Sequence, residues 1–309
     1  MPTSLRLAWG EVVSFRRMGA KMLSAAVTEK YATLQGVLKE MKSLVIGYSG
    51  GVDSTLLLKV AVDQLGQRAL AMIGRSETYP TREFEEALAL AQGMGARYEI
   101  VRTEETDEIK FQENPPDRCY YCKTELFGKL REIAEREGFL WIADGTITDD
   151  LGDFRPGTRA RSEGQVRSPL LEAGFSKADV RELSRHLELP TWDKPSFACL
   201  SSRFPYGTPI LRENLNRVDA AETFLRDHGF RRFRVRFHDT STARVEVDPT
   251  EISRLVQEPF RGELVARLKQ LGFTYVTLDL QGYRTGSMNE VLTEGEKREA
   301  LGGKAGSGV

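Results

Sequence analysis

The chain has 309 residues, enough for more than one domain and for a sizeable buried core. Its 44 basic and 45 acidic residues give a net charge of −1, which disfavours a protein whose main role is to bind long nucleic acid. No apolar run is long enough to span a membrane, and the first residues lack a continuous apolar segment and a cleavage site. We therefore expect a cytoplasmic protein that binds neither nucleic acid nor a membrane.

The predicted elements alternate between strands and helices after an N-terminal extension, residues 1–27. We predict strands at Ser43–Tyr48, Arg68–Ile73, Ala96–Val101 and Phe139–Ala143, and helices at Thr55–Leu65, Thr81–Met94, Lys123–Glu137 and Ser176–His186. Thr81 is expected to be an N-cap, and Ser176 to open a capping box. This alternation predicts an α/β domain with a parallel sheet over residues 28–195.

Prolines then interrupt the chain between residues 190 and 209, and we place a domain boundary there. Residues 196–301 are predicted to form a smaller C-terminal α+β domain for substrate binding or oligomerisation. Its expected elements are a helix at Leu211–His228, strands at Phe233–His238, Ala243–Val247 and Tyr275–Leu280, and helical turns at Pro249–Val256 and Gly262–Leu271. Residues 302–309 are glycine-rich and expected to be a disordered tail.

A glycine loop follows the first predicted strand and has the sequence Ser49, Gly50, Gly51, Val52, Asp53 and Ser54. Two adjacent glycines let amide groups converge on an anion at the start of a helix. The Asp53 carboxylate is suited to Mg²⁺ and to a catalytic role. The loop lacks the lysine of a Walker A sequence, and it resembles the PP-loop of ATP pyrophosphatases. It predicts an enzyme that splits ATP into AMP and pyrophosphate.

Residues at the ends of two other strands are expected to complete the nucleotide site, since ligands bind at the carboxyl edge of a parallel sheet. These are Met72, Ile73, Ser76, Gly145, Thr146, Asp149 and Arg155. For Met72 and Ile73 an ordinary buried strand end explains the pattern equally well. A solvated turn is the alternative for Asp149, and simple surface charge for Arg155.

Three cysteines raise the question of sulfur chemistry. We expect Cys119 and Cys122 in a loop that opens the Lys123–Glu137 helix, where their spacing suits a metal or cluster shared with Cys199. Two buried thiols without a metal are the alternative. Cys199 lies in a proline-rich loop near Lys194 and Arg203, and nearby cations lower the pKa of a thiol. We expect Cys199 and Arg203 to take part in catalysis, although a lone cysteine is often only a small core residue.

An alternating strand, Phe233–His238, places apolar side chains on one face and Arg234 and Arg236 on the other. Glu246 continues the charged face on the next strand. Three interpretations remain open: a site for a phosphorylated substrate, Arg–Glu pairing on a solvated face, and RNA binding.

Together with the glycine loop and residues 144–157, the stretch Ala198–Pro209 makes the chain resemble the LarE family of ATP-dependent sulfur transferases, from about Met41 to Asn289. The resemblance implies ATP and Mg²⁺ as cofactors and a homo-oligomer, a trimer or hexamer. It implies that a carboxylate of pyridinium-3,5-biscarboxylate mononucleotide is adenylated and becomes a thiocarboxylate in nickel-pincer nucleotide biosynthesis. Ser202, Arg234, Arg236 and Glu246 are then expected to bind this substrate.

The resemblance leaves two sulfur sources open. In one, the Cys199 thiolate attacks the acyl-adenylate and is itself consumed. In the other, Cys119, Cys122 and Cys199 hold a [4Fe–4S] cluster that supplies sulfide. Three rival classes also remain: a tRNA thiolation enzyme, an ammonia-using synthetase such as the GMP or NAD synthetases, and a nucleotide-binding sensor without turnover.

Overall fold

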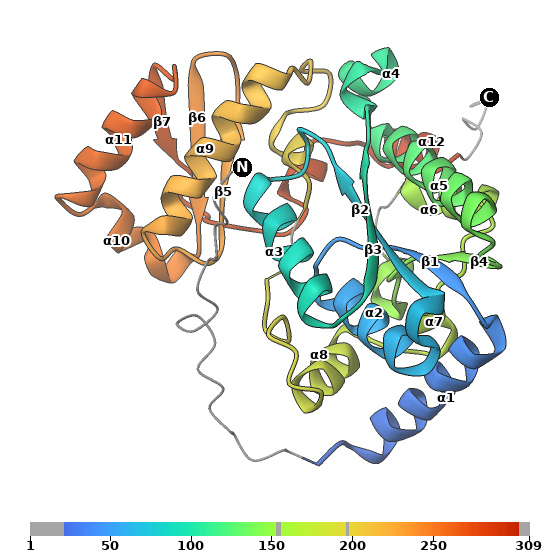
Figure 1. Cartoon of the computed structure of the whole chain (residues 1–309). Helices are drawn as coiled ribbons and strands as arrows, with labels where there is room; N and C mark the ends of the chain where they lie inside the picture. The colour runs from blue at the N-terminus through green and yellow to red at the C-terminus, as the bar shows by residue number, and fades with distance from the viewer. Residues whose placement is uncertain (1–21, 153–155, 196–197, 303–309) are drawn as a thin grey trace, which may run out of the picture.

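The larger sheet consists of four parallel strands: β1 (Leu44–Gly47), β2 (Ala69–Arg75), β3 (Arg97–Arg102) and β4 (Trp141–Ala143). The computed structural model describes residues 22–152, 156–195 and 198–302. In space the strands follow the order β3–β2–β1–β4 (Figure 1). The predicted α/β class and all four predicted strands are confirmed. Because β1 is central, the loop that follows it opens at the middle of the carboxyl edge of the sheet.

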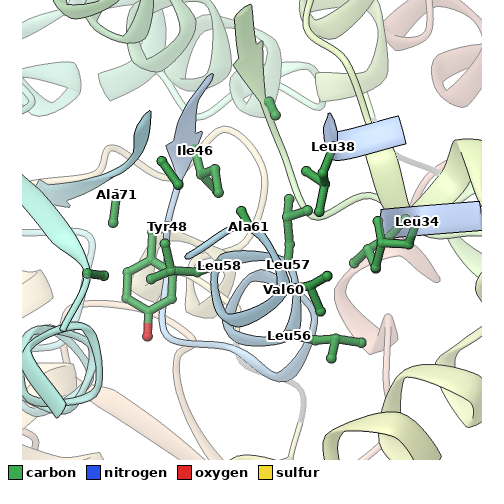
Figure 2. Close-up of a cluster of buried hydrophobic side chains, with 14 of the residues drawn as sticks. Leu34, Leu38, Ile46, Tyr48, Leu56, Leu57, Leu58, Val60, Ala61 and Ala71 are labelled. Atoms are coloured by element: carbon green, nitrogen blue, oxygen red, sulfur yellow. The ribbon is translucent and has the colours of Figure 1, made fainter. Parts of the chain in front are cut away.

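Helices cover both faces of this sheet. One face packs against α1 (Ala25–Met41), α2 (Val52–Leu65), α3 (Thr81–Gly93) and α8 (Lys177–His186), and the other against α5 (Arg118–Glu137) and α6 (Gly157–Glu163). In β1, Leu44 and Ile46 belong to the first core and Val45 to the second, as side-chain alternation requires. Figure 2 shows the first core, in which the side chains of α2 lie between Ile46 and Leu34 of α1.

Two local predictions differ from the structure, and one helix is additional to those predicted. Pro80, not Thr81, is the N-cap of α3, and Thr81 is the first helical residue. The helix expected from Lys123 begins at Arg118, so it contains both Cys119 and Cys122. We did not predict α1, which begins at Ala25 and buries side chains at helical spacing: Val27, Leu34, Leu38 and Met41. The Ser176 capping box with Asp179 is present as predicted.

The smaller sheet contains β5 (Phe233–Phe237), β6 (Thr242–Val247) and β7 (Tyr275–Leu278). β5 and β6 are antiparallel, whereas β6 and β7 are parallel. The predicted α+β character of this region is confirmed. The remaining helices are α4 (Ile109–Gln112), α7 (Pro169–Glu172), α9 (Arg212–Asp227), α10 (Ile252–Val256), α11 (Phe260–Gln270) and α12 (Glu294–Ala300).

The core of the smaller sheet also receives side chains from the first half of the chain. Phe111 is buried in it, and Cys122 packs against it, while the other members come from residue 200 onwards. Segment 111–122 therefore joins the two halves of the molecule. Among the described residues, no helix is long and apolar enough to cross a membrane.

Candidate active site

The glycine loop connects β1 to the first turn of α2. The Ser54 hydroxyl lies 3.3 Å from the Ser49 amide nitrogen and 3.2 Å from the Ser49 hydroxyl, which closes the loop. Gly50 has a φ of +61°, and a Cβ there would lie 2.7 Å from the Cβ of Ala87 in α3. Gly51 is the N-cap of α2 and, as a glycine, has no side-chain oxygen to occupy the first helical amides. The loop therefore offers amides and a positive helix end to an anion.

Two lysines that are distant in sequence lie beside this loop. Lys177 Nζ is 2.8 Å and 2.6 Å from the two carboxylate oxygens of Asp53. Lys194 Nζ is 3.3 Å from the Gly50 carbonyl oxygen and also contacts two glutamates of α3. Sequence reasoning missed Lys177, and it placed Lys194 near Cys199 rather than at the glycine loop. The negative charge of Asp53 is thus matched by a lysine before any nucleotide binds.

The end of β2 contains the next predicted ligands. Met72 and Ile73 are fully buried, and the Met72 carbonyl accepts the Tyr48 amide at 2.9 Å. Ser76 follows the strand and donates its hydroxyl to Glu105 at 2.7 Å. Glu105, which sequence reasoning also missed, is 3% exposed. Its carboxylate holds the Ser76 hydroxyl at the carboxyl edge of the sheet.

The loop after β4 lies directly against the start of α2. A Cβ on Gly145 would lie 3.1 Å from the Ser54 amide nitrogen, so a glycine permits this close approach. The Thr146 hydroxyl donates to Asp144 at 2.8 Å. Asp149 accepts the Lys177 amide at 3.0 Å. These predicted ligands therefore gather around the glycine loop, while Arg155 lies outside the described residues.

Two consecutive residues, Thr78 and Tyr79, connect the glycine loop to the cysteine loop. The Tyr79 hydroxyl donates to the Ser49 carbonyl at 2.6 Å. The Thr78 carbonyl accepts the amide of Leu200, the residue after Cys199, at 2.8 Å. Burial raises the pKa of Tyr79 far above its usual range, so its hydroxyl stays protonated and can donate. The two loops are thus brought to the same edge of the larger sheet.

The cysteine loop is anchored by a buried arginine. Cys199 precedes a short 3₁₀ helix, and its carbonyl accepts the Ser202 hydroxyl at 2.8 Å and the Arg203 guanidinium at 2.9 Å. Arg203 is 1% exposed and pairs with Glu222 of α9 through two bonds of 2.9 Å and 2.7 Å. Arg203 therefore fixes the backbone that carries the Cys199 thiol.

Cys119 and Cys122 lie in the first turns of α5, not in the loop that we predicted. Burial raises the pKa of the Cys122 thiol well above its usual range, and electrostatic interactions with nearby Glu105 and Cys199 act in the same direction. The three thiols are thus close enough to affect one another electrostatically, and none forms a disulfide. Within the described ranges, however, no three cysteine, histidine, aspartate or glutamate side chains are placed to hold a metal ion.

The charged face of β5 is not a solvated surface. Arg236 pairs with fully buried Glu246 through bonds of 2.9 Å and 2.8 Å. It also donates to the Ser202 carbonyl and to the Ser287 hydroxyl, both at 2.9 Å. Of the three interpretations, solvated Arg–Glu pairing is therefore wrong for Arg236, because the pair is buried. Arg236 connects the smaller sheet to the cysteine loop, and Ser287 is a partner that the sequence did not reveal.

Arg234 lies beside a cavity of about 610 Å³ that is also lined by Arg181, Arg232 and Tyr283. The Arg234 guanidinium donates to the Tyr283 hydroxyl at 3.3 Å. Burial, together with the nearby Arg203 cation, lowers the pKa of Arg234 to about 10. Three acidic residues also line the cavity: Asp193, Asp248 and Glu251. Asp248 pairs with Arg232 at 3.2 Å, so an anion would be drawn to the Arg234 side.

The geometry therefore combines three chemical functions on neighbouring loops. The glycine loop suits a polyphosphate, the Cys199 loop carries a thiol, and the cavity beside Arg234 suits an anionic group. A nucleotide that activates an acid and a sulfur nucleophile that attacks it are compatible with this arrangement.

Several known proteins are similar to this chain over all or part of its length. A family model described as NAD synthase matches residues 27–134. A pyridinium-3,5-bisthiocarboxylic acid mononucleotide synthase from Lactiplantibacillus plantarum is 41% identical over 273 residues, which cover 88% of this chain and 98% of the relative. An uncharacterised protein from Synechocystis is 46% identical over 86% of this chain and 98% of its own length.

A more distant relative shares only part of the chain. An ammonia-dependent NAD⁺ synthetase from Chlorobaculum tepidum is 26% identical over 166 residues, 51% of this chain and 58% of the relative. The similarity to the synthase from Lactiplantibacillus, by contrast, extends through both sheets.

Proposed function

The chain belongs to the LarE family of ATP-dependent sulfur transferases, and we propose that it converts a carboxylate of pyridinium-3,5-biscarboxylate mononucleotide to a thiocarboxylate, a step of nickel-pincer nucleotide biosynthesis. The contact that supports this most directly is the Thr78–Tyr79 link, which brings the glycine loop and the Cys199 loop together. A loop that binds ATP for adenylation is compatible with many nucleophiles. A thiol held beside that loop makes sulfur the nucleophile that replaces AMP.

The proposed reaction has three balanced steps. A substrate carboxylate oxygen attacks the α-phosphorus of ATP, which forms an acyl-adenylate and releases pyrophosphate. The Cys199 thiolate then attacks the acyl carbon, and AMP leaves with the former carboxylate oxygen. Finally a base removes the α-proton of Cys199 and its Cβ–S bond breaks, which leaves dehydroalanine in the protein and a thiocarboxylate in the product.

The residues divide these tasks in the proposal. The amides of the glycine loop bind the β- and γ-phosphates, and Ser76, Gly145 and Thr146 border the remainder of the nucleotide. Arg234 binds the phosphate of the mononucleotide in its cavity. Arg236, with Glu246 and Ser202, positions the cysteine loop against the substrate.

Asp53 is a suitable single protein ligand for Mg²⁺, since this ion commonly takes one or two carboxylates and completes its shell with phosphates and water. The ion would neutralise charge on the phosphates as pyrophosphate departs. In the structure the Asp53 carboxylate contacts Lys177 Nζ at 2.6 Å. Binding of Mg²⁺ by Asp53 therefore requires this contact to open.

The three cysteines, as placed in the structure, do not form a site for a metal ion, and we propose that they hold no [4Fe–4S] cluster. Cluster ligands are thiolates, and burial raises the pKa of Cys122, so bound iron would have to offset this burial for Cys122 to serve as a ligand. No three such ligands converge in the described part of the chain. We therefore propose Cys199 as the sulfur source and retain the cluster as the alternative outcome of the following experiment.

Anaerobic purification with iron and sulfide analysis, followed by intact mass before and after turnover, distinguishes the two sources. For the proposed reaction we expect no bound iron, one product per chain, and a protein lighter by one H₂S. A brown protein of unchanged mass that makes several products per chain would establish the cluster instead.

Pyrophosphate release tests the adenylation step itself. We expect release from ATP to depend on the pyridinium biscarboxylate mononucleotide and not to respond to ammonia. Release that required ammonia would favour the synthetase class, and nucleotide binding without any release would indicate a sensor.

We further propose a cytoplasmic homo-oligomer, a trimer or hexamer as in the family. The edge strand β7 supports an interface, because Tyr275 is 62% exposed there and nearby Leu280 is 83% exposed. Light scattering should give a mass three or six times that of one chain. A monomer would contradict this part of the proposal.

A further inference from the structure

The Lys177–Asp53 ion pair places an ammonium group, carried on a flexible side chain, beside the glycine loop. The pair joins the first residue of α8 to the first turn of α2, 124 residues apart in sequence. The two side chains remain 32% and 26% exposed, so water and ligands can reach them. Such a pair in contact with solvent contributes little to stability, and its exchange for another partner costs little.

The backbone at Lys177 is held more firmly than its side chain. Its amide donates to Asp149 at 3.0 Å. The capping box of α8 fixes the preceding turn, and Asp179 of that box pairs with Lys30 of α1 at 2.7 Å. The ammonium group can therefore change partner while its Cα stays beside the glycine loop.

The second lysine at the loop differs in this respect. Lys194 Nζ contacts Glu83 at 2.8 Å, Glu86 at 3.1 Å and the Gly50 carbonyl at 3.3 Å, and its side chain is only 15% exposed. Lys194 is paired with two carboxylates, whereas Lys177 is paired with Asp53, the carboxylate that would bind Mg²⁺. Lys177 is thus the cation that becomes available when the nucleotide binds.

Building on the proposed function, we propose that Lys177 exchanges Asp53 for a phosphate oxygen of ATP when Mg–ATP binds. Lys177 then supplies the positive charge that a Walker lysine supplies elsewhere and that this glycine loop lacks. The same movement frees the Asp53 carboxylate for Mg²⁺. Before ATP binds, the charges of the Lys177 ammonium and the Asp53 carboxylate neutralise each other at the glycine loop.

Calorimetric titration of the full chain with a non-hydrolysable ATP analogue tests this exchange. We expect Lys177→Met, which keeps the aliphatic stem, to weaken binding about ten- to a hundred-fold, the usual effect of losing one charged hydrogen bond. The loss should be larger without Mg²⁺, because Asp53 then repels the phosphates with no cation between them. Lys177→Arg should recover part of the affinity.

Lys59→Met is the matched control, because Lys59 pairs with Asp63 at 2.6 Å on the same helix α2. It should bind the analogue like the unmodified chain. Unchanged binding by Lys177→Met, with a thermal midpoint equal to that of the control, would overturn the exchange while leaving the proposed function intact. Failure of the unmodified chain to bind the analogue would instead overturn the proposed function.

Discussion

Cys122 and Cys199 occupy different surroundings, and this difference supports the proposal that Cys199 is the sulfur source. Cys122 lies on α5 and packs against the core of the smaller sheet. Cys199 lies in a loop whose backbone is held by Arg203 and whose neighbour Leu200 contacts Thr78 near the ATP loop. A sulfur donor must reach the activated carbon, and this placement favours Cys199.

Thiol labelling checks this distinction. Since the thiolate is the reactive form, the raised pKa of Cys122 should make its alkylation slow at mildly alkaline pH. We expect iodoacetamide to modify Cys199 first, with Cys122 reacting only as the pH rises above the ordinary thiol range. Peptide mass mapping gives the order, and Cys122→Ala identifies the slow peptide. Equal rates for Cys122 and a free cysteine peptide would contradict the assignment.

The residues missed from the sequence share one property: their partners are far away along the chain. Lys177 meets Asp53 across 124 residues, and Arg236 meets Ser287 across 51 residues. No local period or spacing marks such pairs. The glycine loop could be predicted because its six residues act together in one turn between a strand and a helix.

At the scale of elements, the glycine loop depends on one backbone position. Gly50 combines a φ of +61° with a site where any Cβ would meet both the Cβ and the Cα of Ala87, at 2.7 Å and 2.9 Å. Only glycine satisfies both conditions at once. The close packing of α3 against the loop therefore sets the shape of the phosphate site.

Gly50→Ala should accordingly destabilise the protein more than a glycine replacement elsewhere. Gly66 is the control, since its φ is +57° but no atom lies within 4 Å of an added Cβ. We expect Gly66→Ala to cost about 1–3 kcal/mol for the backbone alone, because its ψ of −127° lies outside the left-handed helical region. Gly50→Ala should cost about 1–3 kcal/mol more for the steric conflict. Urea unfolding measures both, and equal losses would contradict the steric account.

Strands β1 and β2 were predictable because each is a short apolar run that ends in a turn, and β5 because its apolar and charged residues alternate. The helix boundaries were less predictable. The Cys119–Cys122 spacing suggested a ligand loop, yet Pro115 and Pro116 end the preceding segment and the helix starts directly after Asp117. Helix α1, which was not predicted, buries residues at helical spacing from Val27 to Met41, a pattern that is present in the sequence. Both starts have local signals, the proline pair and Asp117 before α5 and the Ser24 N-cap before α1.

At the scale of the whole molecule, segment 111–122 couples the two sheets. Phe111 is buried in the core of the smaller sheet, and the fully buried Asn114 donates to the Pro205 carbonyl at 2.7 Å. The segment then continues into α5, which covers the larger sheet. A change here should affect how the cysteine loop sits against the ATP loop.

Phe111→Ala should selectively loosen the smaller sheet. Removal of a buried phenylalanine costs about 3–5 kcal/mol, and the loss should appear as faster hydrogen exchange in β5 and β6. Phe127→Ala is the matched control, because Phe127 is 3% exposed in the core on the other side of the larger sheet. Its effect should fall on β1 and β2 instead. If hydrogen exchange increased in the same strands in both variants, the two sheets would not have separate cores joined by segment 111–122.

We propose a route in which sulfur reaches the substrate through Cys199 after ATP activates the carboxylate. Its most direct test follows thiocarboxylate by mass spectrometry, and pyrophosphate in parallel, for the unmodified chain and Cys199→Ala given ATP, Mg²⁺ and the pyridinium biscarboxylate mononucleotide. We predict that Cys199→Ala retains substrate-dependent pyrophosphate release but makes no thiocarboxylate. Thiocarboxylate formation by Cys199→Ala at the unmodified level would contradict the account.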